Sequence, residues 1–224
     1  MTDPGLKDRL KAVQDRIAAA AARAHRNASD VRLIAVTKVF PASAILDGYE
    51  LGLREFGENY VQEFEGKAPQ VSGLDGARFH LIGHLQSNKS RRAAELFNVI
   101  QSVDSAKLAR RLGEGDRELD VLIEVKLSSE GSKSGAAEEE VPAIVDACRA
   151  APKLRLLGMM TVPPWSEDAE QSRPYFARLR ELAAQHGLRE LSMGMSNDME
   201  VAIEEGATCV RVGTALFGKR KKPA

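Results

Sequence analysis

A regular alternation of short apolar runs with longer helical patterns is the feature that most limits how this 224-residue chain can fold. The apolar runs are unbroken rather than alternating with polar residues, which is typical of strands buried on both faces of a parallel sheet. Eight strand-then-helix units can be counted. The predicted strands span 32–37, 55–58, 79–82, 99–102, 121–125, 154–160, 190–193 and 209–212.

Helical patterns follow these strands, and one further helix precedes them. The predicted helices span 41–51, 60–67, 87–96, 105–112, 138–150, 168–185 and 198–205, with a helical stub at 214–217. The preceding helix opens at Asp3-Pro4, a cap residue followed by proline, and closes near Asn27. Its apolar stripe consists of Leu6, Leu10, Val13, Ile17, Ala20 and Ala24.

Eight βα units in a chain of this length predict an α/β fold of the (β/α)₈ TIM type, with an additional N-terminal helix. An open, doubly wound sheet is the alternative, because strand count alone does not prove closure. No Pro/Ser/Gly-rich linker divides the sequence, so we expect residues 1–224 to form a single domain.

Composition excludes several classes of function. Lysine plus arginine and aspartate plus glutamate each number 32, so the formal charge is zero and no global field draws the protein to nucleic acid or to a membrane. Cys148 and Cys209 form no CxxC pair, which favours two buried, reduced thiols over a zinc site or a disulfide. The sequence opens without an apolar signal core, so we expect a cytoplasmic protein.

Lys38 comes directly after the first predicted strand and is the main candidate for chemistry. In a barrel of this type, functional residues lie on the loops that follow the strands. A lysine in a dry barrel mouth has a lowered pKa and is a good amine nucleophile toward carbonyls, as a Schiff base requires. A surface lysine that starts a loop is the alternative.

Two later loops carry the marks of an anion site. Ser196 or Asn197 is expected to cap the helix after the seventh strand, with Glu200 completing a capping box. Gly213 and Thr214 follow the eighth strand. Barrels often bind phosphate at the loops after strands seven and eight, so these residues predict a phosphorylated ligand. His80 and His84 lack a third ligand at sensible spacing, and we expect structural or pocket-lining histidines.

Several strand-end segments together resemble the pyridoxal phosphate homeostasis proteins, relatives of the barrel domain of alanine racemase. They cover the chain from about the first strand to its end. The segments are 35–38 (AVTK), 56–60 (FGENY), 80–89 (HLIGHLQSNK), 132–135 (SKSG), 158–161 (GMMT), 191–199 and 211–218.

The resemblance implies a mostly monomeric barrel that carries pyridoxal 5′-phosphate on Lys38, takes part in intracellular vitamin B6 homeostasis and has no established catalytic activity. It implies that Ser196, Gly213 and Thr214 hold the phosphate. It further implies that Arg211 faces the pyridine nitrogen and that two more residues, Asn59 and Met195, line the pocket. The expected partners are the small-molecule cofactor and, transiently, apo-enzymes that depend on it.

An arginine opposite the ring nitrogen would favour a carrier over a catalyst. Arginine does not give up its proton at ordinary pH, so the ring nitrogen stays unprotonated and the ring is a weak electron sink. Racemisation also needs a second proton-transfer group, which alanine racemase takes from a partner subunit in an arrangement with an extra β-domain, and we expect no such domain here.

Two classes of alternative remain open. One is an enzyme, either an amino-acid racemase that uses pyridoxal phosphate or a barrel enzyme acting on a sugar phosphate. The other concerns Arg211 alone, which could form an ion pair with Glu55 or Glu124 in the barrel interior.

Overall fold

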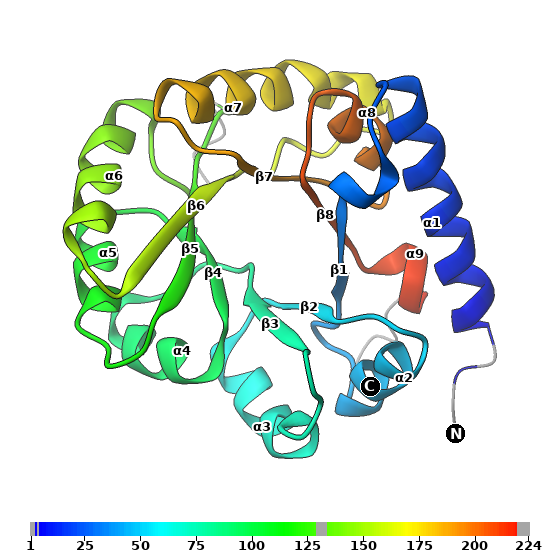
Figure 1. The fold of residues 1–224 in the computed structure, drawn as a ribbon, viewed down its shortest axis with the longest axis horizontal. Helices are drawn as coiled ribbons and strands as arrows, with labels where there is room; N and C mark the ends of the chain where they lie inside the picture. Colours follow the sequence, from blue (N-terminus) through cyan, green and yellow to red (C-terminus); the bar gives the residue numbers. More distant parts are fainter. Residues whose placement is uncertain (1–2, 4, 129–133, 219–224) are drawn as a thin grey trace.

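Eight parallel strands hydrogen-bond in chain order and close into a barrel (Figure 1). The computed structural model describes residues 3, 5–128 and 134–218. The strands are β1 (Arg32–Val36), β2 (Glu55–Glu58), β3 (Arg78–Leu81), β4 (Val99–Val103), β5 (Leu119–Glu124), β6 (Leu154–Met160), β7 (Glu190–Met195) and β8 (Cys209–Val212). Pairing of β1 with β8, from Arg32 with Cys209 to Ala35 with Val212, closes the ring. The predicted (β/α)₈ barrel is confirmed, and the open sheet is wrong.

Helices surround the barrel and follow the strands in turn (Figure 1). They are α2 (Ala42–Glu50), α3 (Val61–Val71), α4 (Ser90–Leu96), α5 (Ala106–Gly113), α6 (Val141–Ala150), α7 (Arg173–Gln185), α8 (Met199–Glu204) and α9 (Thr214–Phe217). The helices predicted at 138–150 and 168–185 each open with a 3₁₀ turn, η3 (Glu138–Glu140) and η4 (Ala169–Ser172). Pro142 and Pro174 stand in the first turn of the following α-helix, where a missing backbone N–H costs no hydrogen bond.

The additional N-terminal helix is confirmed as α1 (Leu6–Arg23), with its ends shifted from those predicted. Gly5 occupies the N-cap, and the Asp3 carboxylate accepts the backbone N–H of Gly5 at 3.0 Å. Pro4 lies outside the described residues. The helix packs its apolar stripe against α8 and α9, so it covers the C-terminal part of the barrel (Figure 1).

The barrel interior mixes apolar and polar side chains. Val99, Leu122 and Met160 form a small apolar cluster of their own, separate from the main core. The predicted burial of both cysteines is confirmed, and burial raises the pKa of the Cys148 and Cys209 thiols to about 11 each. Among the helices within the described ranges, none is both long and apolar enough to cross a membrane.

A buried ion pair ties α3 to the ends of β1 and β2. The Lys67 ammonium donates to both carboxylate oxygens of Glu58, at 2.8 and 3.0 Å, and to the backbone carbonyl of Thr37 at 3.0 Å. It also reaches Glu63 at 2.6 Å. Burial raises the pKa of Glu58, although Lys67 and Thr37 hydrogen-bond its charged form. Each charge therefore depends on the other to stay inside the protein.

We expect Lys67→Met to lower the free energy of unfolding by about 3–5 kcal/mol, because it leaves the Glu58 carboxyl buried without its partner. Lys11→Met is the matched control, since Lys11 also pairs with a carboxylate four residues away but both side chains are exposed. That control should cost about 0.5 kcal/mol or less. Urea denaturation at neutral pH measures both, and equal losses would contradict the importance of the buried pair.

Candidate functional site

A pocket of about 220 Å³ lies at the carboxyl ends of the strands and collects most of the predicted site residues. Six of the seven line it: Lys38, Met195, Ser196, Arg211, Gly213 and Thr214. The other lining residues are Val36, Ile82, Pro164, Trp165, Ser166, Asn197 and Asp198. The loops after β1, β7 and β8 thus meet at one place, as expected for strands that are neighbours in a closed barrel.

Lys38 is half-buried, two positions after the last residue of β1, and lines this pocket, which favours the predicted site over a surface lysine. The residues on either side of it are held by Glu58 and Glu63, the two carboxylates that Lys67 contacts. The Thr37 hydroxyl donates to Glu58 at 2.8 Å, and the Val39 backbone N–H donates to Glu63 at 2.6 Å. Val39 has a φ of 61°, a left-handed conformation that costs a β-branched residue free energy. The backbone around Lys38 is therefore held in place from both sides.

The loops after β7 and β8 meet at Ser196 and at the start of α9. The Ser196 hydroxyl accepts the backbone N–H of Ala215 at 3.4 Å. Gly213 lies against β1: a Cβ there would stand 3.4 Å from both the Cβ and the carbonyl oxygen of Val36. Two hydroxyls, those of Ser196 and Thr214, line the pocket beside the backbone of Gly213. Such a set of donors suits a small anion.

The predicted cap of the helix after β7 is wrong. Asp198, not Ser196 or Asn197, occupies the N-cap of α8. Its carboxylate accepts the Met195 backbone N–H at 2.7 Å and the Ser172 hydroxyl at 2.9 Å, so it closes the loop rather than capping the helix. Glu200 does not complete a capping box; it pairs with Arg16 of α1 at 2.6 Å.

Arg211 enters the pocket from β8 with its guanidinium fully anchored in the barrel. Its Nη1 donates to the Ser192 hydroxyl at 2.7 Å, and its Nη2 donates to the Thr161 carbonyl at 2.9 Å. The side chain is only 4% exposed, and burial lowers the pKa of Arg211. Within the described part of the chain it forms no ion pair. The predicted alternative is wrong, since Glu55 contacts His80 and Arg78 instead.

Asn59 follows β2 and is the one predicted residue that does not line the pocket. Its side-chain oxygen is buried and has no hydrogen-bond partner among the described residues. Its backbone packs so closely on Gly83 that a Cβ there would lie 2.4 Å from the Asn59 carbonyl oxygen. Glu124, at the end of β5, accepts from Ser134 at 2.9 Å through one oxygen, and burial raises its pKa.

The sequence patterns did not lead us to the loop after β6. Trp165 is 76% exposed at the edge of the pocket, and the Asn197 side chain ties its loop to Ser166 with a 3.0 Å hydrogen bond. A lone tryptophan after two prolines in a strand-end loop was the available signal. Of the predicted histidines, His80 lies in the barrel interior and His84 contacts Asp104 at 3.2 Å. The predicted segment 132–135 lies partly outside the described residues.

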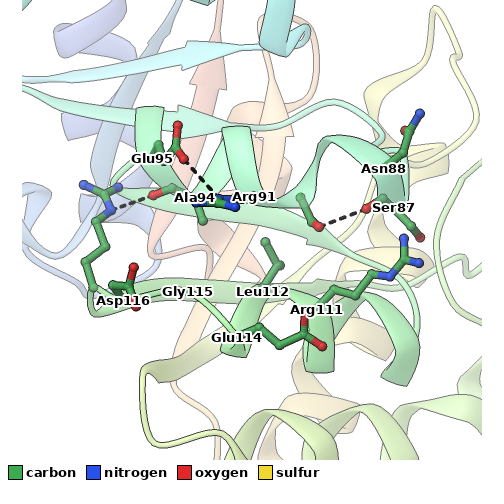
Figure 2. Close-up of a pocket in the computed structure, with 12 residues that line it drawn as sticks. Ser87, Asn88, Arg91, Ala94, Glu95, Arg111, Leu112, Glu114, Gly115 and Asp116 are labelled. Atoms are coloured by element: carbon green, nitrogen blue, oxygen red, sulfur yellow. Dashed lines mark hydrogen bonds and ion pairs between the residues drawn. The ribbon is translucent and has the colours of Figure 1, made fainter.

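A larger cavity of about 680 Å³ lies on the flank of the barrel, between α4 and α5 (Figure 2). Figure 2 shows arginines and carboxylates of opposite charge around it, including the pair of Arg91 with Glu95 at 3.6 Å. The Arg117 guanidinium donates to the Ala94 carbonyl at its rim. Because it lies against helices rather than at the strand ends, and its charges balance, it lacks the features of the main site.

Comparison with known proteins places this site in a family. Residues 9–221 match the family described as "Alanine racemase, N-terminal domain". The chain is 46% identical over 221 residues to the pyridoxal phosphate homeostasis protein of Pseudomonas aeruginosa, with 96% of each chain covered. It is 42% identical over 224 residues to the Escherichia coli protein of the same name, covering 94% of this chain and 95% of the other.

Solved structures agree with the sequence matches. PipY of Synechococcus elongatus with pyridoxal phosphate bound is 37% identical and superimposes with a TM-score of 0.83, covering 95% of this chain and 100% of PipY. Alanine racemase of Corynebacterium glutamicum is 22% identical, with a TM-score of 0.65 over 94% of this chain and 61% of that one, which shows a shared fold alone. This chain therefore belongs to the alanine racemase N-terminal domain family and, within it, to the pyridoxal phosphate homeostasis proteins.

Proposed function

We propose that this protein binds pyridoxal 5′-phosphate as a Schiff base on Lys38 and stores or delivers it in vitamin B6 homeostasis. One observation carries the proposal: a primary amine, a buried guanidinium and two hydroxyls line a single small pocket at the mouth of the barrel. The names of the family relatives and the cofactor bound to PipY support the same ligand.

The residues present fit the functional groups of that cofactor. An aldehyde needs a primary amine, which Lys38 offers from a half-buried position. A phosphate needs several donors and close backbone approach, which Ser196, Gly213 and Thr214 offer together. A pyridine nitrogen needs a donor, and Arg211 carries only donors. Met195 lines the same pocket, whereas Asn59 lies outside it, which gives the proposed role of Asn59 less support.

An arginine, Arg211, opposite the pyridine nitrogen of the cofactor favours a carrier over an enzyme. When bound, pyridoxal phosphate supplies an electron sink, and a protonated ring nitrogen strengthens that sink. Arg211 donates a hydrogen bond without giving up a proton, so it favours an unprotonated nitrogen. Lys38 then presents the cofactor in a form suited to retention rather than to rapid chemistry on amino acids. The likeness to alanine racemase concerns the fold and does not bring its reaction to this chain.

The same proposal describes a cytoplasmic monomer that meets pyridoxal phosphate-dependent apo-enzymes transiently. Its formal charge of zero and its two buried, free thiols are consistent with that setting. Transfer to an acceptor requires a reversible bond, which a Schiff base on a half-buried lysine satisfies.

We expect borohydride reduction of the protein mixed with pyridoxal phosphate to fix one pyridoxyl group per chain on Lys38. Peptide mass spectrometry locates the label, and the visible absorption of the complex should disappear in Lys38→Ala. Lys89→Ala is the matched control and should keep both the band and the label. A label on Lys89 or on Lys133, which lies outside the described residues, would contradict the assignment.

The proposed phosphate site predicts a ligand-dependent effect of Thr214→Val. Losing a hydrogen bond to a charged group costs roughly 1.5–3 kcal/mol, or about tenfold to a hundredfold in affinity. We therefore expect that loss for pyridoxal phosphate and little change for pyridoxal, which has no phosphate, when both are titrated by absorbance. Equal losses for the two ligands would place the phosphate elsewhere.

A further inference from the structure

A continuous chain of hydrogen-bonded side chains crosses the barrel interior from the site to the opposite end. The Arg211 Nη1 donates to the Ser192 hydroxyl at 2.7 Å, and that hydroxyl donates to the Gln101 Oε1 at 2.6 Å. The Gln101 Nε2 meets the His80 Nδ1 at 3.0 Å, and the His80 Nε2 contacts the Glu55 carboxylate. Five strands contribute one residue each: β8, β7, β4, β3 and β2 (Figure 1).

These residues are shielded from water along almost the whole path. Ser192, Gln101, His80 and Arg211 are each at most 4% exposed. Among these residues only Glu55, the last member of the hydrogen-bonded series, is partly exposed. Its carboxylate also lies 3.9 Å from the Arg78 guanidinium. In such surroundings a broken hydrogen bond leaves an unsatisfied polar group, so the members depend on one another.

Only one direction of the bonds fits a neutral His80. Glu55 is a carboxylate, because the hydrogen bond from His80 and the charges of Arg78 and Arg32 outweigh burial and lower its pKa. A carboxylate only accepts, so the His80 Nε2 carries hydrogen. Burial lowers the pKa of His80, so its Nδ1 is an acceptor.

The rest of the chain follows from the tautomer of His80. The amide nitrogen of Gln101 must face His80 Nδ1, so its oxygen faces Ser192 and accepts the Ser192 hydroxyl proton. The Ser192 oxygen is left to accept from Arg211. Every bond then points the same way, from the guanidinium toward the carboxylate. The opposite amide orientation would need a protonated His80 in the same interior as the Arg211 charge.

We propose that Ser192, Gln101, His80 and Glu55 form a relay of positioning residues, which holds the Arg211 guanidinium aimed into the pocket and links its charge to the Glu55 carboxylate. This inference rests on the proposed function, because the group that Arg211 meets in the pocket is the pyridine nitrogen of pyridoxal phosphate. The Arg211 guanidinium forms no ion pair within the described residues. The relay explains how it is nevertheless kept buried and correctly oriented. The hydrogen bonds of the relay all point from the Arg211 guanidinium toward the Glu55 carboxylate, and this alignment stabilises the buried charge.

A test in cofactor-free protein addresses the direction of the bonds. Nitrogen-15 NMR of histidine-labelled protein should show His80 neutral, with hydrogen on Nε2. An imidazolium or an Nδ1–H tautomer in the wild type would overturn the relay.

A matched pair of variants tests positioning of Arg211. Ser192→Ala and Ser102→Ala remove a hydroxyl from two strands of the same barrel, each from a fully buried residue, but Ser102 has no hydrogen-bond partner among the described residues. We expect Ser192→Ala to weaken pyridoxal phosphate binding by about tenfold and to shift its visible band. Ser102→Ala should change neither, and Ser192→Thr, which keeps the hydroxyl, should restore both.

The outcomes separate the relay from the function it serves. Equal affinities and equal bands in Ser192→Ala and Ser102→Ala would overturn the relay while leaving binding on Lys38 intact. Failure of the wild-type protein to retain pyridoxal phosphate would overturn both the function and this inference. Thermal unfolding of each variant identifies a general loss of stability, which would lower the melting temperature without moving the band of the cofactor that remains bound.

Discussion

Pairing of the first strand with the last is the constraint on which the rest of the structure depends. The β1–β8 register, from Arg32 opposite Cys209 to Ala35 opposite Val212, brings the end of the first strand beside the end of the last. Lys38 thereby lies in the same pocket as Gly213 and Thr214, more than 170 positions later in the sequence. An open sheet with the same strands would leave the amine and the loops proposed to bind phosphate on separate edges.

Closure also creates an interior in which charge has to be organised rather than solvated. On the β1 side, Lys67 and Glu58 neutralise each other and both contact Thr37, the residue before Lys38. On the β8 side, Arg211 is anchored by Ser192 and by the Thr161 carbonyl. The two arrangements differ in kind: a direct ion pair supports the amine, and a chain of neutral groups supports the guanidinium. Each arrangement positions one group at the mouth of the barrel. For Arg211 this is achieved without a direct carboxylate partner among the described residues.

The sequence was sufficient for the architecture and for most of the pocket, because both follow from periodicity and from where strands end. Eight apolar runs predicted the barrel, strand-end positions predicted Lys38, Ser196, Gly213 and Thr214, and the family resemblance implied Arg211. Closure was predicted from the number of units alone, and the pairing of β1 with β8 establishes it. The N-cap position of Asp198 was missed because Ser, Asn and Asp stand in a row, and side-chain chemistry alone does not decide which one begins the helix.

Interior polar contacts were beyond the sequence for a different reason. Lys67 lies on the buried face of α3 with Phe64 and Val71, where helical spacing indicates burial but not which carboxylate pairs with the ammonium. Gln101 and Ser192 lie in strands buried on both faces, where no alternation tells which residues point into the barrel. Their partnership with His80 and Arg211 depends on strands far apart in the chain, and only the closed barrel brings them together.

The central claim is our proposal that this barrel holds pyridoxal phosphate with Arg211 donating to an unprotonated ring nitrogen, which favours a carrier over an enzyme. Nitrogen-15 NMR of ring-labelled cofactor bound to the wild-type protein tests it most directly. The account predicts the chemical shift of an unprotonated, hydrogen-bonded pyridine nitrogen at neutral pH. The shift of a protonated pyridinium would contradict the role of Arg211 and remove the main physical reason for regarding this protein as a carrier rather than an enzyme.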